Sequence, residues 1–156
     1  MLSEGSPGGC LMKLSIVRSA LTLFAGLVAA GAASAAPPNP VLHLTGTEHY
    51  SAGGKNWVRH RFDVANKDQY PAEMFAPAPD LPPCGSNTNS SQSWVDFYDS
   101  QGRRLYGFCA LGTPANLGKI WFATEEGTAP PSWVYIVITD RRTNTKYKSN
   151  LAETTP

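Results

Sequence analysis

Apolar and polar residues alternate with a period of two over much of this sequence, and no other feature constrains the fold as strongly. Within residues 57–65, positions 58, 62 and 64 are apolar, whereas positions 59, 61 and 63 are charged. A period of two is typical of a β-strand with one buried face. No segment after position 36 keeps the 3.6-residue period of an amphipathic helix. The sequence therefore predicts an all-β protein.

Seven short strands are expected, separated by turn residues. They cover residues 41–50, 57–65, 93–98, 103–111, 119–124, 133–139 and 146–149. The run 133–139 is apolar on both faces, which predicts a central strand, and the charged segment 146–149 predicts an edge strand. This pattern indicates an antiparallel β-sandwich of immunoglobulin or fibronectin type III kind. A small closed barrel is the alternative, and we expect the tail 151–156 to be frayed.

The first 35 residues are typical of an export signal. Lys13 and Arg18 precede the uncharged run 20–31, and a small-x-small cleavage site follows at 33–35. The apolar run is shorter than the roughly 20 residues of a membrane-spanning helix. Residues 1–11 read as an upstream extension of the signal, and residues 36–156 as one mature domain. We expect a secreted or periplasmic protein with no transmembrane segment after cleavage.

The charge and the cysteines of the sequence indicate which partners the protein binds and whether its compartment is oxidising. The chain has 13 basic and 12 acidic residues without a basic cluster, so nucleic acid is not an expected partner. Two cysteines, Cys84 and Cys109, follow the signal, and an oxidising compartment predicts a disulfide between them. This bond would tie the proline-rich connection 70–92 to a strand. We expect it to stabilise the fold by about 3–4 kcal/mol.

The sequence offers little for metal binding or catalysis. His43 and His49 are predicted to share a strand face about 20 Å apart, too far to bind one ion. His60 falls on the apolar side of its own strand, where cross-strand pairing would bring it near Glu48. Because neither a metal site nor a nucleophile motif is recognisable, we expect no metal, no cofactor and no enzymatic activity.

Aromatic residues on two facing strands predict a binding platform. Its members are Trp94, Asp96, Tyr98, Arg104, Tyr106 and Phe108. Aromatic rings on one sheet face can stack on a flat apolar surface or on a sugar. The alternative is that this face is a wall of the core or is covered by the proline-rich loop. The other tryptophans, Trp57, Trp121 and Trp133, are expected in the core or at its rim.

Three segments carry a resemblance to known domains. They are FAPAPDLPPCG (75–85), WVDFYD (94–99) and WVYIVITDRRTNTKYKSN (133–150). All three look similar to small secreted bacterial domains without assigned activity, and the last one also resembles the closing hairpin of fibronectin type III modules. The resemblance implies a secreted, sandwich-like domain and carries no catalytic motif.

The expected function is a non-enzymatic binding module for a protein or a cell-envelope component. Contacts would come from the platform and from the loop 77–92, which includes Asp80. One alternative is a carbohydrate-binding module, which requires exposed and coplanar rings at positions 94, 98 and 106. Another is a protease inhibitor, which requires the segment 80–83 to be exposed, convex and extended.

Overall fold

The computed structural model describes residues 36–84, 90–110 and 112–155 of the 156-residue chain. The predicted signal, residues 1–35, and its upstream extension, residues 1–11, lie outside the described residues. Over the described ranges, no helix is long and apolar enough to cross a membrane.

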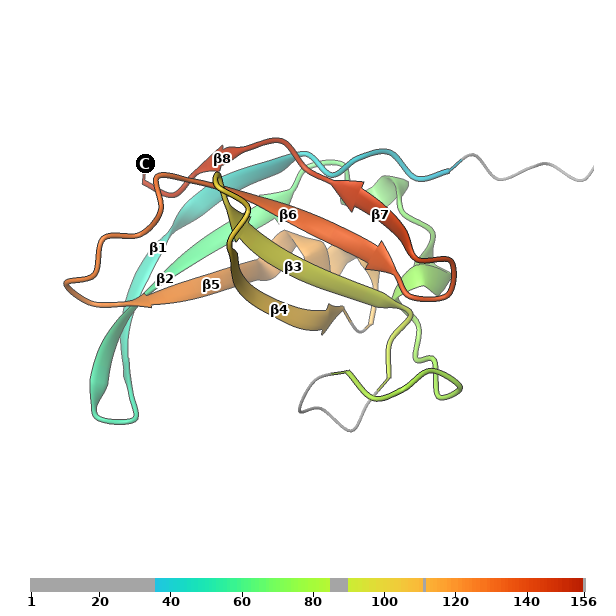
Figure 1. Cartoon of the computed structure of the whole chain (residues 1–156), viewed down its shortest axis with the longest axis horizontal. Helices are drawn as coiled ribbons and strands as arrows, with labels where there is room; N and C mark the ends of the chain where they lie inside the picture. The colour runs from blue at the N-terminus through green and yellow to red at the C-terminus, as the bar shows by residue number, and fades with distance from the viewer. Residues whose placement is uncertain (1–35, 85–89, 111, 156) are drawn as a thin grey trace, which may run out of the picture. The chain divides into compact units, whose positions relative to one another are not determined.

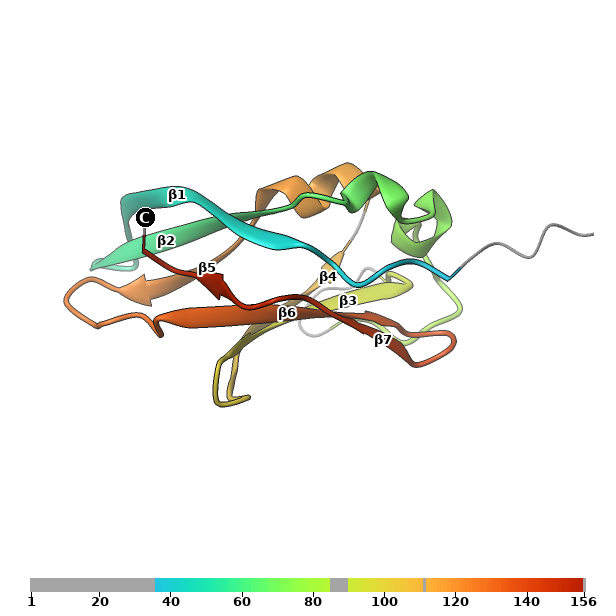
Figure 2. The ribbon, with the colours of Figure 1, turned by 90° about the horizontal axis from the view of Figure 1, so that it is seen from above.

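The described chain forms two antiparallel sheets (Figures 1 and 2). The first sheet has the order β1-β2-β5 and contains β1 (Leu42–Ala52), β2 (Lys55–Val64) and β5 (Ile120–Glu125). The second has the order β4-β3-β6-β7 and contains β3 (Ser93–Asp99), β4 (Arg104–Ala110), β6 (Trp133–Asp140) and β7 (Thr145–Lys148). A short strand, β8 (Ala152–Glu153), also pairs with β6. The predicted all-β antiparallel sandwich is confirmed, with β6 inside its sheet and β7 at an edge.

The hydrophobic core lies between the two sheets because alternate residues of the inner strands point inward. In β3, Val95 and Phe97 are fully buried, whereas the residues on either side of each are partly exposed or polar. The Phe97 ring lies 5.5 Å from the ring of Phe62 in β2 and 5.5 Å from that of Phe122 in β5. Burial of each such side chain contributes about 1.5–3 kcal/mol, so these cross-sheet contacts hold the layers together.

The turn between β1 and β2 is shorter than the six residues 51–56 predicted from composition. Only Gly53 and Gly54 separate the strands, and both have positive φ angles, 60° and 74°. A two-residue turn with two positive φ angles is the type I′ turn that suits the twist of a β-hairpin, and glycine adopts it without strain. At this turn β1 therefore ends two residues later than predicted, at Ala52, and β2 begins two residues earlier, at Lys55.

The C-terminal tail is held in the sheet, so the predicted fraying is wrong. Ala152 pairs with Val134 of β6, and Thr154 is fully buried. The backbone N–H of Thr154 donates to the carbonyl of Ser132, and its own carbonyl accepts a hydrogen bond from His60 Nδ1 at 3.1 Å. Burial and paired backbone groups fix the tail, which its polar composition did not reveal.

The connection between β2 and β3 is anchored at several points. It contains two 3₁₀ helices, η1 (Lys67–Gln69) and η2 (Ala72–Phe75), and a third, η3 (Pro114–Lys119), precedes β5. Met74 and Phe75 of η2 are buried in the core. The predicted disulfide between Cys84 and Cys109 is confirmed and ties this connection to β4.

Candidate functional site

The outer face of the second sheet carries four of the predicted platform residues. Trp94, Asp96 and Tyr98 alternate with buried residues of β3 and are partly exposed, as predicted. Arg104 of β4 lies opposite Tyr98 on the same face. This part of the platform is therefore neither a wall of the core nor fully covered.

The Trp94 end of this face forms a closed polar cluster. Trp94 Nε1 and Arg104 Nε both donate to Asp96 Oδ1, at 2.7 and 2.6 Å, and the Arg104 guanidinium lies 5.7 Å from the centre of the Trp94 ring. Gly107 faces Asp96 across the strands, and a Cβ there would come within 2.9 Å of Trp94 and collide with Asp96 and Arg104. A glycine at 107 thus makes room for the cluster, whose polar groups already have partners.

The other end of the same face is a stacked pair of tyrosines. The rings of Tyr98 and Tyr135 are nearly parallel, with centres 5.3 Å apart, and Lys148 Nζ lies 4.1 Å from the centre of the Tyr135 ring. Burial and the nearby Asp96 carboxylate raise the pKa of the Tyr98 hydroxyl, so this ring remains a neutral hydrogen-bond donor at physiological pH.

Tyr106 and Phe108 do not belong to this platform, which corrects the prediction that all four rings share one face. Tyr106 lies opposite Phe97 and Phe108 opposite Val95, and directly opposed residues point to the same side of a sheet. Both rings therefore leave the sheet on the side of the first sheet. Leu105 is an extra residue in this ladder and separates Tyr106 from Arg104. The predicted coplanar set of rings 94, 98 and 106 does not exist.

Tyr106 instead joins an aromatic surface at the outer side of the first sheet. Its ring stacks on Trp121 of β5 with centres 6.0 Å apart, and on Phe108 at the same distance. Trp121 points outward because its neighbours Ile120 and Phe122 are in the core. Of the two expected positions of Trp121, core or rim, the core is therefore excluded, and the side chain is partly buried. Trp57 also points outward, and Trp133 is 42% exposed, so neither is in the core.

Arg59 continues this stack on the other side of Trp121. Its guanidinium carbon lies 4.4 Å from the centre of the Trp121 ring and 4.5 Å from that of Tyr50. Arg59 Nη1 donates to Glu48 Oε2 at 3.1 Å, and Arg61 donates to the same oxygen through Nε at 3.0 Å and also through Nη2. The hydrogen bond from Arg61 is the main reason why the pKa of Glu48 lies below its usual value. Cation, rings and carboxylate thus fix one another in place.

Two depressions flank the stacked pair of Trp121 and Tyr106. The larger has a volume of about 410 Å³ and is lined by Tyr50, Ala52, Gly53, Trp57, Leu105, Tyr106, Trp121 and Ala123. The smaller has a volume of about 210 Å³ and is lined by Tyr106, Phe108, Asn116, Lys119, Ile120 and Trp121. We call the two depressions together the aromatic groove. The larger one falls within the size range of small-molecule sites, about 300–1,000 Å³.

Sequence reasoning missed the aromatic groove, although a signal for it was present. Trp57 and Arg59 have the parity opposite to the core residues of β2, and Trp121 alternates with two core residues of β5. These parities place all three side chains on the outer face of one sheet, as the ladder pairs Arg59–Ala123 and Arg61–Trp121 confirm. The pairing of β2 with β5, which lie far apart in sequence, was unknown, and so were the bulges that set the faces of Tyr50 and Tyr106.

The histidines are arranged differently from the prediction. The ladder between β1 and β2 shifts between Leu44 and Gly46, so His43 faces Asp63 whereas His49 faces Val58, and the two histidines lie on opposite faces. Glu48 lies opposite Arg59 in the ladder, so its side chain and that of His60 are on opposite faces of the sheet. His60 is 2% exposed and contacts the Thr154 carbonyl and the Thr124 hydroxyl. Within the described ranges, no group of three or more His, Cys, Asp and Glu side chains could hold a metal ion.

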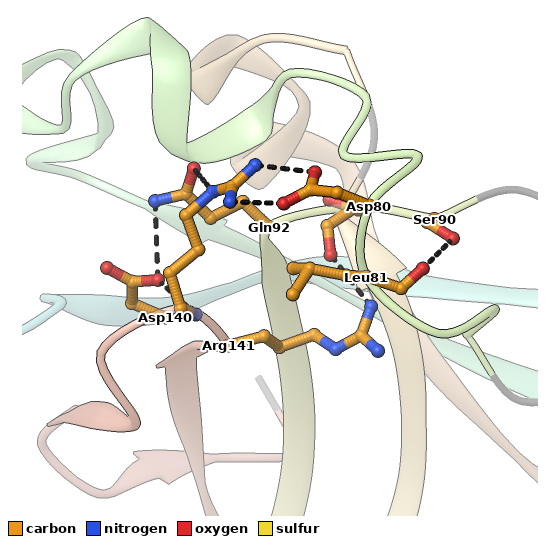
Figure 3. Close-up of polar contacts among 8 residues, drawn as sticks. Asp80, Leu81, Ser90, Gln92, Asp140 and Arg141 are labelled. Atoms are coloured by element: carbon orange, nitrogen blue, oxygen red, sulfur yellow. Dashed lines mark hydrogen bonds and ion pairs between the residues drawn. The ribbon is translucent and has the colours of Figure 1, made fainter.

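Asp80 belongs to a network of polar contacts that connects the proline-rich loop to the end of β6 (Figure 3). Arg142 donates two hydrogen bonds to the Asp80 carboxylate, at 2.5 and 2.8 Å, and a third to Gln92, which in turn donates to Asp140. The hydrogen bond from Arg142 is the main cause that lowers the pKa of Asp80. Arg141 donates to the carbonyls of Pro82 and Ser91 and to the sulfur of Cys84.

The segment that a protease inhibitor would present, residues 80–83, begins inside a turn. Asp80, Pro82 and Pro83 are exposed. However, the N–H of Leu81 donates to the carbonyl of Ala78 at 3.0 Å, which closes a β-turn. The extended conformation that the inhibitor alternative requires is therefore absent from residues 78–81.

No protein-family model, curated protein or solved structure matches this chain. The site is accordingly defined by its own geometry, which consists of a closed aromatic cluster on one sheet and an open aromatic groove beside the other.

Proposed function

We propose that this chain is an exported, non-enzymatic binding module that recognises its partner, a protein or another cell-envelope component, through the aromatic groove. The observation that carries the proposal is the stack of Tyr50, Arg59, Trp121 and Tyr106 beside a depression of about 410 Å³. Tyrosine, tryptophan and arginine are the residues that most often dominate binding energy at recognition surfaces. Tyr106 is 43% exposed, so its ring is accessible to a partner.

Asp99 of the second sheet has a structural role. Asp99 is 1% exposed and accepts hydrogen bonds from the backbone N–H groups of Gln101 and Arg103, which fixes the turn between β3 and β4. Burial raises the pKa of Asp99, but the bonds from Arg103 outweigh this effect and the pKa falls below its usual value. A carboxylate held ionised inside a turn stabilises the fold and is poorly placed to exchange protons with a substrate.

The test is capture of partners by the protein produced from the full chain, immobilised and exposed to solubilised cell envelope and to culture medium. Trp121→Ala removes the central ring of the groove, and Trp133→Ala removes an exposed tryptophan that does not line it. We expect Trp121→Ala to abolish capture and Trp133→Ala to retain it, with both variants folded by circular dichroism. Equal capture by the two variants would refute the groove as the recognition surface.

Ala123→Leu is a complementary variant because it adds bulk and removes no contact. Ala123 lines the larger depression and lies opposite Arg59 in the ladder, so a leucine there would occupy ligand volume. We expect loss of capture without loss of stability. The export part of the proposal is tested separately by N-terminal sequencing of the protein recovered outside the cytoplasm, which should begin near Ala36.

A further inference from the structure

The aromatic groove has two compartments that share a wall. Trp121 and Tyr106 line both the larger and the smaller depression, and their stacked rings form the ridge between them. A compact ligand would occupy one compartment only. A linear ligand with repeated units can cross the ridge and place successive units in both compartments.

The groove also carries an excess of positive charge. Lys119 lines the smaller depression, and Arg59 and Arg61 lie beside it on the outer face of the first sheet, where both contact Glu48. Together these four side chains carry two positive charges. Lys119 is exposed in the lining of the smaller depression, so its ammonium group is accessible to a ligand.

The neighbouring ion pairs do not offset this excess. Lys55 pairs with Glu125 at 2.8 Å, and Lys67 pairs with Asp63 at 2.8 Å, so each pair is neutral. The whole chain has a formal charge of only +1. The positive charge of the groove is therefore a local feature, and it complements an anionic ligand.

We propose, on the basis of the proposed function, that the aromatic groove binds a linear glycan composed of uronic acids. The apolar faces of the sugar rings would stack on Trp121 and Tyr106, whose N–H and O–H groups can bond sugar hydroxyls. Sugar carboxylates would meet Lys119 and Arg61. The groove has few cations, Lys119 in its lining and Arg61 beside it, which favours uronic acids over more densely charged sulfated chains.

The test measures the binding of defined probes by isothermal titration calorimetry, using the protein produced from the full chain. The probe is a galacturonic acid hexamer. The comparison compounds are cellohexaose, which has sugar rings without charge, a hexaglutamate peptide, which has charge without rings, and a heparin hexasaccharide, which is sulfated. We expect the galacturonic acid hexamer to bind best, and cellohexaose and hexaglutamate each to bind about tenfold more weakly or less.

Variants assign the binding to the groove. Trp121→Ala and Tyr106→Ala should each weaken hexamer binding about tenfold, through loss of stacking. Lys119→Gln should weaken it severalfold and reduce its dependence on salt. Trp133→Ala and Lys146→Gln are matched controls outside the groove and should bind normally. Tyr106 is 43% exposed, so its variant keeps the test valid if Trp121→Ala does not fold.

Several results would overturn this inference. Equal binding of cellohexaose would exclude charge recognition, equal binding of hexaglutamate would exclude ring recognition, and tighter binding of the heparin hexasaccharide would indicate a sulfated ligand. Absence of binding to all four probes would also overturn it. In each case the proposed function stands if capture from the cell envelope still depends on Trp121, and it falls too if capture does not.

Discussion

The side chain of Asn150 bonds the backbone of Leu42 at the free edge of β1, as a neighbouring strand would. Removing this side chain is the most informative test of how the two sheets are joined. Its Oδ1 accepts the backbone N–H of Leu42 at 2.7 Å, and its Nδ2 donates to the carbonyl of Leu42 at 2.9 Å and to that of Leu151 at 2.9 Å. Leu42 itself is 2% exposed and belongs to the core. One side chain thus satisfies both backbone groups of a core residue.

Asn150→Ala removes these bonds and leaves the Leu42 backbone groups without a protein partner. Loss of a partner by a buried polar group costs about 1–3 kcal/mol. Because Asn150 is exposed, water can replace part of the lost bonding. We therefore expect the free energy of unfolding to fall by about 1–2 kcal/mol in total. With a urea m value of about 1.5 kcal/mol/M, the midpoint of unfolding should fall by about 1 M.

The assay is equilibrium unfolding in urea with the disulfide intact, followed by tryptophan fluorescence. Asn56→Ala is the matched control because the side chain of Asn56 accepts one exposed hydrogen bond, from the Ser51 hydroxyl. This substitution should cost less than about 0.5 kcal/mol. Asn150→Asp keeps an acceptor for the Leu42 N–H but places a carboxylate oxygen against the Leu42 carbonyl, so it should not restore stability. If Asn150→Ala and Asn56→Ala unfold at the same urea concentration, the strand-like role of Asn150 is wrong.

Three further predictions follow from contacts elsewhere in the fold. Burial lowers the pKa of His60 below its usual value of about 6.5, so the folded state favours the neutral ring. Thermal stability should therefore decline as the pH falls below about 6.5, and His60→Gln should remove this decline between pH 5 and 7. Reduction and alkylation of Cys84 and Cys109 should lower the free energy of unfolding by about 3–4 kcal/mol, measured in urea. Arg141→Gln should accelerate hydrogen exchange at the Leu81 amide while leaving the core amides unchanged, because its contacts are with the loop.

The fold class could be predicted because strand periodicity is a local property of the sequence. The parity of Phe62 and Val64 against Arg61 and Asp63 assigns the two faces of β2 without knowledge of its neighbours, and the structure agrees at every one of these positions. The disulfide was predictable for a similar reason, because only Cys84 and Cys109 follow the expected signal.

The side-chain faces of β1 and β4 could not be predicted, since each strand contains a bulge. One extra residue shifts all later side chains to the opposite face of the sheet. In β4 the extra residue is Leu105, and it separates Arg104 from Tyr106, which simple alternation places together. In β1 the register shifts between Leu44 and Gly46. The sequence indicated this bulge only through Gly46, an isolated glycine inside a strand.

The difference between the two aromatic surfaces follows from the small residues between their rings. On the second sheet, Gly107 leaves a space that Asp96 and Arg104 fill with their own hydrogen bonds, so a ligand would have to displace contacts that already exist. Beside the first sheet, Ala123 leaves a space that no side chain of the described ranges fills, and it lines the larger compartment together with Trp121. Binding there requires only the displacement of water from rings that are already held in place. The preorganised rings around Ala123 therefore make the first sheet the more favourable site for recognition.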